Sequence, residues 1–168
     1  NGLACAITAS SGYGAGEMPA GTGLWLNNCL GELELNRQGL GAGPAGKRLP
    51  SNMAPSCART TDRMLAVGSP GADRITTALH QFLVNFLQLG LDLGQAVALP
   101  RLHLKIEGTS RNLAIEPGLE LPDIAMDVTR YDELSMYFGG VAAALNDNGN
   151  LATAADPRRE GGTIVMLR

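Results

Sequence analysis

The sequence predicts a mixed α/β domain in which helices are layered on sheets. Three observations support this. The elements read as strands, then two helices, then strands, an order typical of helices packed on a sheet. One segment has a strong helical period. Glycine (22) and proline (9) are spread through the 168 residues, which favours many turns and argues against a helical bundle or coiled coil. The length fits one domain or one part of a larger one.

The composition narrows the classes of partner. Hydrophobic residues make up 45% of the chain, which excludes a disordered protein. Charged residues make up 17%, against about 25% in typical soluble domains, so we expect a large face to be covered by another chain. The net charge is −3 without a basic stripe, which argues against a nucleic-acid partner. No run of 18 apolar residues occurs, so no membrane span is predicted.

The first third is predicted to hold two short strands and a long loop. Residues 3–10 are small and apolar and read as a strand, followed by a glycine-rich turn at 12–16. Residues 23–28 read as a second strand that ends at two asparagines. Residues 36–50 form a loop of a length that is usually functional or disordered.

The middle of the chain predicts a hairpin and two helices. Residues 53–60 and 63–68 flank Thr61-Asp62 as a hairpin. A helix over 72–89 is predicted because apolar residues recur with a helical period, and it is expected to stop at Gly90. A second, short helix covers 94–99. The apolar face of the long helix consists of Ile75, Leu79, Phe82, Leu83, Phe86 and Leu87.

The last third is rich in predicted strands. Two hairpins are expected, the second across the turn dipeptide Asn148-Gly149. Residues 121–128 are ambiguous. The predicted strands are 102–107, 112–116, 136–146, 151–155 and 163–167.

Cysteine and histidine offer little chemistry. Cys5, Cys29 and Cys57 are odd in number and widely spaced, which fits neither a disulfide framework nor a zinc site, so three buried thiols are predicted. The two histidines are His80, on the polar face of the long helix, and His103, in a strand. Nothing in the spacing couples either to a cysteine, and they are too isolated for a metal site. No metal or cofactor is predicted.

One candidate site is the strand-to-helix junction at residues 68–72, Gly-Ser-Pro-Gly-Ala. A helix N-terminus presents unpaired N–H groups and a partial positive charge, and glycine permits close approach. Such a corner can hold a carboxylate, a phosphate or a developing oxyanion. The alternative is a tight structural turn. A Walker loop is excluded because its lysine and spacing are absent.

Two further polar segments are open to either a functional or a local role. Ser51 and Asn52 can bind a small polar ligand or satisfy turn backbone. Glu32 or Glu34 can neutralise a ligand ammonium or face solvent, and residues 47–48 read as a solvated basic pair. From the residues alone, no nucleophile is visible.

These same segments, in order, resemble the small subunit of gamma-glutamyltransferases, which belong to the N-terminal nucleophile hydrolase superfamily. The resemblance covers nearly the whole chain. Its matching stretches are residues 13–16 (YGAG), 23–28 (GLWLNN), 43–55 (GPAGKRLPSNMAP), 68–75 (GSPGADRI), 98–103 (ALPRLH) and 155–158 (ADPR).

The resemblance implies an α+β fold, a four-layer αββα sandwich shared by a large and a small subunit. In the family a precursor cuts itself, and the new N-terminal threonine attacks a γ-glutamyl amide to form an acyl-enzyme that water or an amine resolves. That threonine lies upstream of Asn1. Residues 1–168 are therefore expected to be a single partial domain, which lacks the first strand with its nucleophilic threonine and the large subunit and is inactive alone.

The resemblance also assigns roles. Gly71 and Ala72 match the oxyanion-hole glycine pair, since alanine still supplies an N–H. Ser51 matches the first of two serines that hold the substrate α-carboxylate, and Asn52 replaces the second while remaining a donor.

Recognition of the substrate α-ammonium is assigned to Glu32, where the family usually has aspartate. Cys29 stands where a glutamine or glutamate often helps. Asn28 and Ser10 complete the implied substrate contacts.

The resemblance implies a bacterial enzyme that transfers or hydrolyses γ-glutamyl groups of amides such as glutathione, with a large-subunit partner. The departures leave alternatives: a related amide hydrolase, such as a β-lactam acylase or poly-γ-glutamate processing enzyme, or a non-catalytic relative. The compartment is not predicted; periplasmic, secreted and cytoplasmic locations all remain open.

Overall fold

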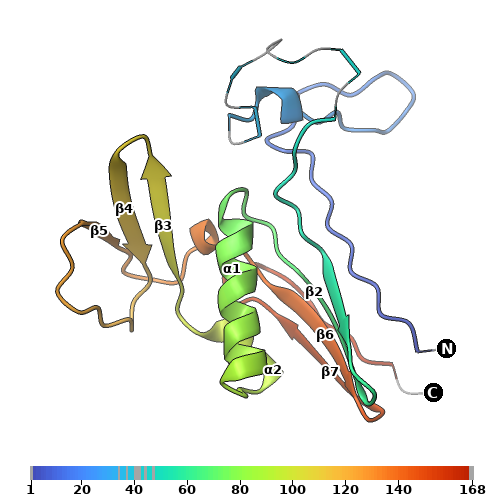
Figure 1. The fold of residues 1–168 in the computed structure, drawn as a ribbon. Coiled ribbons are helices and arrows are strands. Elements are labelled where there is room, and N and C mark those ends of the chain that lie inside the picture. Colours follow the sequence, from blue (N-terminus) through green and yellow to red (C-terminus); the bar gives the residue numbers. More distant parts are fainter. Residues whose placement is uncertain are drawn as a thin grey trace.

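The computed structural model describes residues 2–33, 35–36, 38–39, 43, 45–46 and 48–166. Two sheets and two main helices form the body, and the described residues between 10 and 53 form a lobe at one end, called the 10–53 lobe below (Figure 1). The predicted fold, with helices layered on a sheet, is confirmed. Glu34, Lys47, Leu167 and part of the 36–50 loop lie outside the described residues.

The larger sheet has four antiparallel strands in the order β1-β2-β6-β7. The predicted hairpins form here, and the second turns at Asn148 and Gly149, both with positive φ. The strands are β1 (Ser56–Arg59), β2 (Arg63–Gly68), β6 (Ala142–Asp147) and β7 (Asn150–Ala155).

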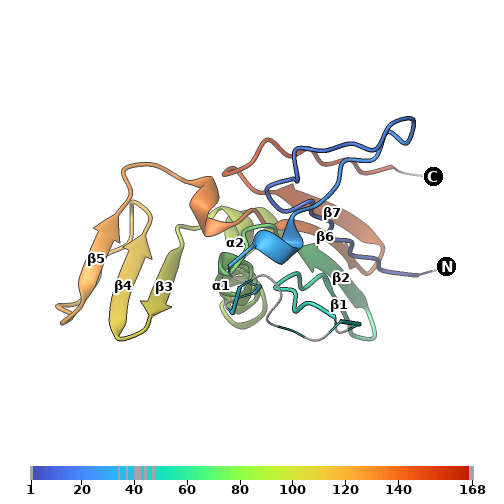
Figure 2. The same cartoon turned by 90° about the horizontal axis from the view of Figure 1, so that it is seen from above.

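The smaller sheet stands apart on the far side of the helices (Figure 2). β3 (Leu102–Glu107) and β4 (Ser110–Ile115) form the predicted hairpin. β5 (Asp127–Arg130) pairs with β4 in parallel, which resolves only the end of the ambiguous segment 121–128 as strand.

The long helix is confirmed with an altered end. α1 (Arg74–Leu83) continues into η2 (Val84–Gln88), a π-helical turn, and the chain leaves at Gly90 with φ 69°. α2 (Leu93–Ala98) is the predicted short helix, and Asp92 caps it by accepting from the Gln95 N–H.

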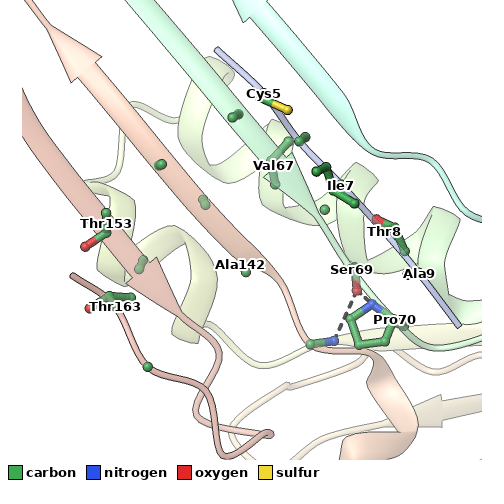
Figure 3. A pocket seen from close by; sticks show the side chains of 18 of the residues that line it. Cys5, Ile7, Thr8, Ala9, Val67, Ser69, Pro70, Ala142, Thr153 and Thr163 are labelled. Carbon is green, nitrogen blue, oxygen red and sulfur yellow. Dashed lines mark hydrogen bonds between the residues drawn. The ribbon is translucent and has the colours of Figure 1, made fainter. Parts of the chain in front are cut away.

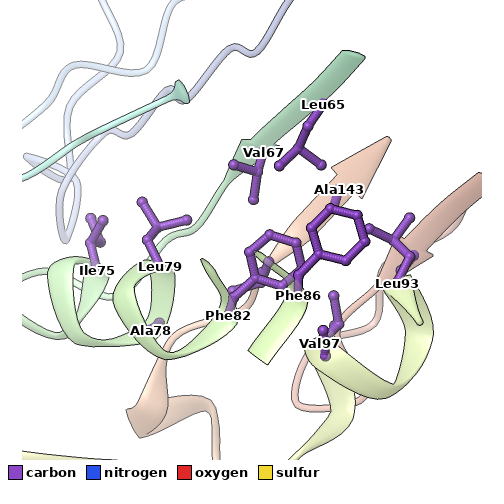
Figure 4. Close-up of a cluster of buried hydrophobic side chains, with 13 residues drawn as sticks. Leu65, Val67, Ile75, Ala78, Leu79, Phe82, Phe86, Leu93, Val97 and Ala143 are labelled. Atoms are coloured by element: carbon purple, nitrogen blue, oxygen red, sulfur yellow. The ribbon is translucent and has the colours of Figure 1, made fainter. Parts of the chain in front are cut away.

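The main core lies between these helices and one face of the larger sheet (Figure 4). Phe82 and Phe86 stack with ring centroids 5.8 Å apart and meet Leu65 and Val67 from β2 and Ala143 from β6. Each large apolar side chain buried in this way stabilises the fold by roughly 1.5–3 kcal/mol. Ile75 and Leu79 belong to the same cluster, so this packing holds α1 along its length against the larger sheet.

Three predicted strands are wrong. Residues 3–10, 23–28 and 163–166 are not in strands. Residues 3–10 run alongside β2, from near Met64 to near Gly68, without bridging to it, so the backbone gains no ladder partner (Figure 3). Residues 23–28 have only isolated backbone bonds, such as those between Leu26 and the 15–17 segment.

Strand boundaries also differ. β1 begins at Ser56, three residues later than predicted, and β4 begins at Ser110, two residues earlier than predicted. Residues 136–141 form the short 3₁₀ helix η3 (Met136–Phe138) and a two-glycine turn, because Gly139 has φ 88° and cannot continue a strand.

The prediction of three buried thiols is wrong. Cys5 and Cys57 are exposed, Cys29 is half-buried, and all three are free. Cys5 lies in the segment that runs alongside β2, and Cys57 lies on the edge strand β1, so neither is enclosed by a second layer. Within the described residues, none of the helices has both the length and the apolar character needed to cross a bilayer.

Candidate functional site

A cavity of about 540 Å³ lies where the 10–53 lobe meets the junction between β2 and α1. It brings together six of the seven candidate residues from separate parts of the sequence. The seventh, Asn28, lies beside the cavity wall, where its Oδ1 accepts from the Tyr13 N–H at 2.7 Å. The six are Ser10, Glu32, Ser51, Asn52, Gly71 and Ala72.

The Gly71-Ala72 corner has an unusual backbone. Gly71 has φ 133° and Ala72 has φ 52°, and the left-handed region costs a non-glycine residue about 1–2 kcal/mol. The carbonyls of both residues accept from the first turn of α1, at 2.9 Å for Arg74 N and 3.2 Å for Ile75 N. In the described part of the chain, the N–H groups of Gly71 and Ala72 have no backbone or side-chain acceptor. They remain available to an anionic atom.

A neighbouring turn holds this corner in place. A β-carbon built on Gly71 would lie 2.9 Å from the Cα of Gly139, so the two backbones touch. The hydroxyl of buried Ser69 donates to the Pro70 carbonyl at 2.7 Å and accepts from the Gly140 N–H at 3.1 Å. Figure 3 shows this second bond beside Pro70. The corner and the 139–140 turn therefore form one backbone unit.

The same turn is anchored from behind by a buried ion network. Asp156 Oδ2 accepts from the Val141 N–H and from Arg101 Nη2, both at 2.6 Å. Glu116 Oε1 accepts from the Ser135 N–H at 3.1 Å and from Arg158 Nε at 2.7 Å. All four charged side chains are nearly inaccessible to solvent. The network thus fixes both ends of the 135–141 segment.

The lobe side of the cavity is polar. Ser51 Oγ accepts from the Met53 N–H at 3.1 Å, and Ser10 Oγ accepts from the Gly12 N–H at 2.9 Å. Each hydroxyl hydrogen is left free to donate. A β-carbon on Gly12 would lie 2.0 Å from Glu32 Oε1, so only glycine lets this carboxylate reach the 11–13 turn. A hydroxyl pair and a carboxylate therefore share one wall.

The opposite side is aromatic and cationic, and the sequence did not identify it. Tyr131 and Tyr137 stack at 5.4 Å, and the Arg74 guanidinium lies 4.6 Å from the centroid of the Tyr137 ring. Arg159 also lines the cavity. Arg74 lies within the matching stretch 68–75 and Arg159 directly follows the stretch 155–158, and this was the available signal. The tyrosines lie outside them and gave none.

A buried histidine braces the first turn of α1 from the smaller sheet. His103 Nδ1 lies 2.9 Å from Thr77 Oγ1, and His103 Nε2 lies 4.0 Å from Asp73 Oδ2. Burial lowers the pKa of His103 below its ordinary 6.5, and Arg74 and Lys105 lower it further while Asp73 opposes them. The imidazole is therefore neutral at neutral pH. Among the described residues, no group of three His, Cys, Asp or Glu side chains lies close enough together to hold a metal ion.

Comparison with known proteins identifies the family to which this site and fold correspond. The family model described as gamma-glutamyltranspeptidase matches residues 1–166. The glutathione hydrolase proenzyme of Pseudomonas aeruginosa is 30% identical over 182 residues, covering 99% of this chain and 32% of that protein. The acylase ACY 1 proenzyme of Pseudomonas sp. strain V22 is 30% identical over 156 residues, covering 92% of this chain and 28% of that protein. The chain thus spans about a third of the length of these relatives.

The fold agrees as well. The gamma-glutamyltranspeptidase of Pseudomonas nitroreducens, solved in complex with L-DON, superimposes with a TM-score of 0.77 at 23% identity, covering 96% of this chain and 92% of that one. The α+β fold expected for the small-subunit part of an N-terminal nucleophile hydrolase is confirmed. This chain belongs to the gamma-glutamyltranspeptidase family.

Proposed function

We propose that the protein containing this chain transfers or hydrolyses γ-glutamyl groups of amides such as glutathione. The observation that carries the proposal is the cavity, in which the lobe's polar wall faces the free N–H groups of the Gly71-Ala72 corner. A γ-glutamyl group has a carboxylate and an ammonium at one end and the reacting carbonyl at the other. These are the groups that the two sides of the cavity complement.

Each end of the substrate has a proposed partner. Ser51 and Asn52 donate to the α-carboxylate, and the Glu32 carboxylate attracts the α-ammonium, with Asn28 and Ser10 completing the polar wall. The N–H groups of Gly71 and Ala72 donate to the carbonyl oxygen as negative charge develops on it. Because these donors are held by the 139–140 turn, they need little reorganisation during the reaction.

The proposed nucleophile is a threonine upstream of Asn1. Its hydroxyl oxygen bonds to the γ-carbonyl carbon, the amide C–N bond breaks, and the hydroxyl proton passes by way of the threonine α-amino group to the leaving amine. Water or an acceptor amine then attacks the ester and releases the threonine. The chain of 168 residues is proposed to be inactive without that threonine.

A large subunit from the same precursor is the proposed partner. Leu3 is 90% exposed, Ile7 83% and Ile164 78%, all on extended segments that border the open face of the larger sheet. Apolar exposure of this kind marks an interaction surface. The low charged fraction of the chain agrees with a covered face.

A related amide hydrolase is the second candidate, supported by the similarity to the acylase proenzyme. The two candidates differ in their need for the α-ammonium. Removing this ammonium, as in a glutaryl amide, should matter only if Glu32 binds it.

Expression of the full-length precursor tests both. The intact mass of the purified small chain should place its N-terminus at a threonine upstream of Asn1, and γ-glutamyl p-nitroanilide should be cleaved much faster than glutaryl p-nitroanilide. Faster cleavage of the glutaryl compound would favour the acylase. A single uncut polypeptide without activity would favour a non-catalytic relative.

A further inference from the structure

Asp73 occupies the N-cap position of α1, directly after the Gly71-Ala72 corner. Aspartate is a preferred N-cap residue because its carboxylate accepts from helix N–H groups, as Asp92 does at α2 from the Gln95 N–H at 2.8 Å. The side chain of Asp73 makes no such bond within the described part of the chain. The described lining of the cavity includes both sequence neighbours of Asp73 but not Asp73 itself. Its carboxylate therefore serves partners other than the helix end or a ligand in the cavity.

One oxygen of this carboxylate holds the guanidinium of Arg74. Asp73 Oδ1 pairs with Arg74 Nη1, and Arg74 Nε donates to the Tyr137 carbonyl at 3.1 Å. The same guanidinium lies over the Tyr137 ring, 4.6 Å from its centroid. Asp73 is thus tied through Arg74 to η3, the element that precedes the 139–140 turn.

The other oxygen faces His103 on the smaller sheet. Asp73 Oδ2 lies 4.0 Å from His103 Nε2, and Thr77 Oγ1, one turn further along α1, lies 2.9 Å from Nδ1. The tautomer with its proton on Nε2 suits both neighbours, because Nδ1 then accepts from the Thr77 hydroxyl and the positive end of the N–H dipole faces the carboxylate. The His103 side chain is only 8% exposed. The carboxylate therefore lies between an arginine of its own helix and a buried imidazole from β3.

The residue that needs this support is Ala72. Its φ of 52° lies in the left-handed region, where a non-glycine residue persists only if the surrounding structure enforces it. The contact with Gly139 fixes the Gly71 side of the corner. On the other side the next residue is Asp73, and a carboxylate tethered to two elements restricts rotation of the backbone between residues 72 and 73.

We propose that Asp73 is a positioning residue, whose carboxylate bridges Arg74 and His103 and thereby keeps Ala72 in the left-handed conformation that presents its N–H to the cavity. This inference rests on the proposed function, in which that N–H binds the developing oxyanion. Asp73 acts through Ala72 and touches no substrate, so its loss should lower kcat and leave KM nearly unchanged. A glycine at position 72 would adopt positive φ without a penalty, so the requirement for Asp73 follows from the alanine.

A double-mutant cycle in the processed full-length protein tests this dependence. We expect Asp73→Asn, which keeps the size and removes the charge, to lower kcat for γ-glutamyl p-nitroanilide by roughly tenfold, the usual penalty of the left-handed region for alanine. In the Ala72→Gly background the same substitution should lower kcat only about twofold, because glycine populates positive and negative φ about equally. Asp92→Asn removes an aspartate from the start of the other helix and should leave kcat unchanged.

The imidazole of His103 reports the contact directly. Burial lowers the pKa of His103, the Asp73 carboxylate opposes this, and Arg74 and Lys105 add to it, while the ring of Tyr137 meets the imidazole edge to face. Asp73→Asn should therefore move the pKa of His103 further below its ordinary value. NMR of the imidazole signal that disappears in His103→Gln measures this shift, and the control variant at the start of α2 should not cause it.

The outcomes separate this inference from the proposed function. An unchanged pKa of His103 in Asp73→Asn would show that the carboxylate does not face the imidazole. Equal losses of kcat in the Ala72 and Ala72→Gly backgrounds would show that Asp73 supports the fold and not Ala72. Either result, or an unchanged kcat in Asp73→Asn, overturns the inference. Absence of wild-type cleavage of the anilide would instead overturn the proposed function, and the NMR comparison does not depend on activity.

Discussion

The Cα of Gly139 lies 2.9 Å from the point where a β-carbon on Gly71 would stand. Neither residue can carry a side chain without separating the two backbones. Gly71 belongs to the corner with the free N–H groups, and Gly139 belongs to a turn 68 residues later in the sequence that the ion network anchors. The site is thus positioned by backbone-to-backbone contact, not by a side chain of its own.

Gly139→Ala should damage both stability and turnover. The new β-carbon would lie 2.9 Å from Ser69 Oγ and 3.0 Å from the Pro70 carbonyl oxygen, in a residue with φ 88°. Overpacking and backbone strain should together cost about 2–4 kcal/mol in the free energy of unfolding. Displacement of the corner should lower kcat by about a hundredfold, measured with γ-glutamyl p-nitroanilide.

Gly149→Ala is the matched control. Gly149 has nearly the same φ, 87°, but an added β-carbon meets nothing within 4 Å. It should cost only the backbone strain and leave kcat unchanged. Equal kcat in the two variants would show that the Gly71–Gly139 contact does not position the site.

Arg158→Met should be severely destabilising. It would leave the buried carboxylates of Glu116 and Asp156 without their shared partner, which typically costs about 3–5 kcal/mol. Chemical denaturation of the processed protein measures this. Arg63→Met, which breaks the exposed pair between Arg63 and Asp147, should cost less than about 1 kcal/mol. Similar losses in both variants would contradict the importance of the buried network.

Local signals predicted most of the fold. The helix over 72–89 and the hairpin at Asn148-Gly149 were predicted because a helical period and a turn dipeptide are properties of the sequence itself. The predicted strand over residues 3–10 was wrong because a strand needs a neighbouring strand to bond its backbone, and the local sequence does not encode that neighbour. The prediction that Cys5 and Cys57 are buried was wrong for the same reason, because burial of a side chain depends on what covers its segment.

The candidate site was predicted from motifs, and its missing parts lay outside them. Ser51, Glu32 and Gly71 were named from the resemblance, and the structure brings them to one cavity. Tyr131 and Tyr137 were not found because a single aromatic residue after a strand or in a short 3₁₀ helix has no sequence signature of its own. Their place depends on how the smaller sheet packs against α1.

Glu32→Gln should weaken substrate recognition while retaining shape. If Glu32 binds the α-ammonium, loss of its charge should raise KM for γ-glutamyl p-nitroanilide by roughly tenfold or more. The glutaryl anilide, which has no ammonium, should not be affected. Ser51→Ala should raise KM for both substrates if their carboxylates share that site. Unchanged steady-state constants in both variants would remove these residues from the site.

Stability should fall in mild acid because of His103. The folded protein holds the pKa of His103 below 6.5 by burial, whereas the unfolded chain binds a proton at the ordinary value. As the pH falls below about 6.5, the unfolded state takes up more protons, so the free energy of unfolding decreases until the folded-state pKa is passed. The contribution of neutral, buried His103 to the free energy of unfolding is therefore fully present above about pH 7.5 and is lost below the folded-state pKa.

The two histidines of the chain provide the test. Denaturation midpoints at about pH 7.5 and about pH 5.5 should differ more in wild type than in His103→Gln, because glutamine does not titrate in this range. His80→Gln removes the exposed histidine on α1 and should keep the wild-type difference. If His80→Gln and not His103→Gln flattened the pH dependence, the buried imidazole beside Thr77 and Asp73 would not be the group that senses acid.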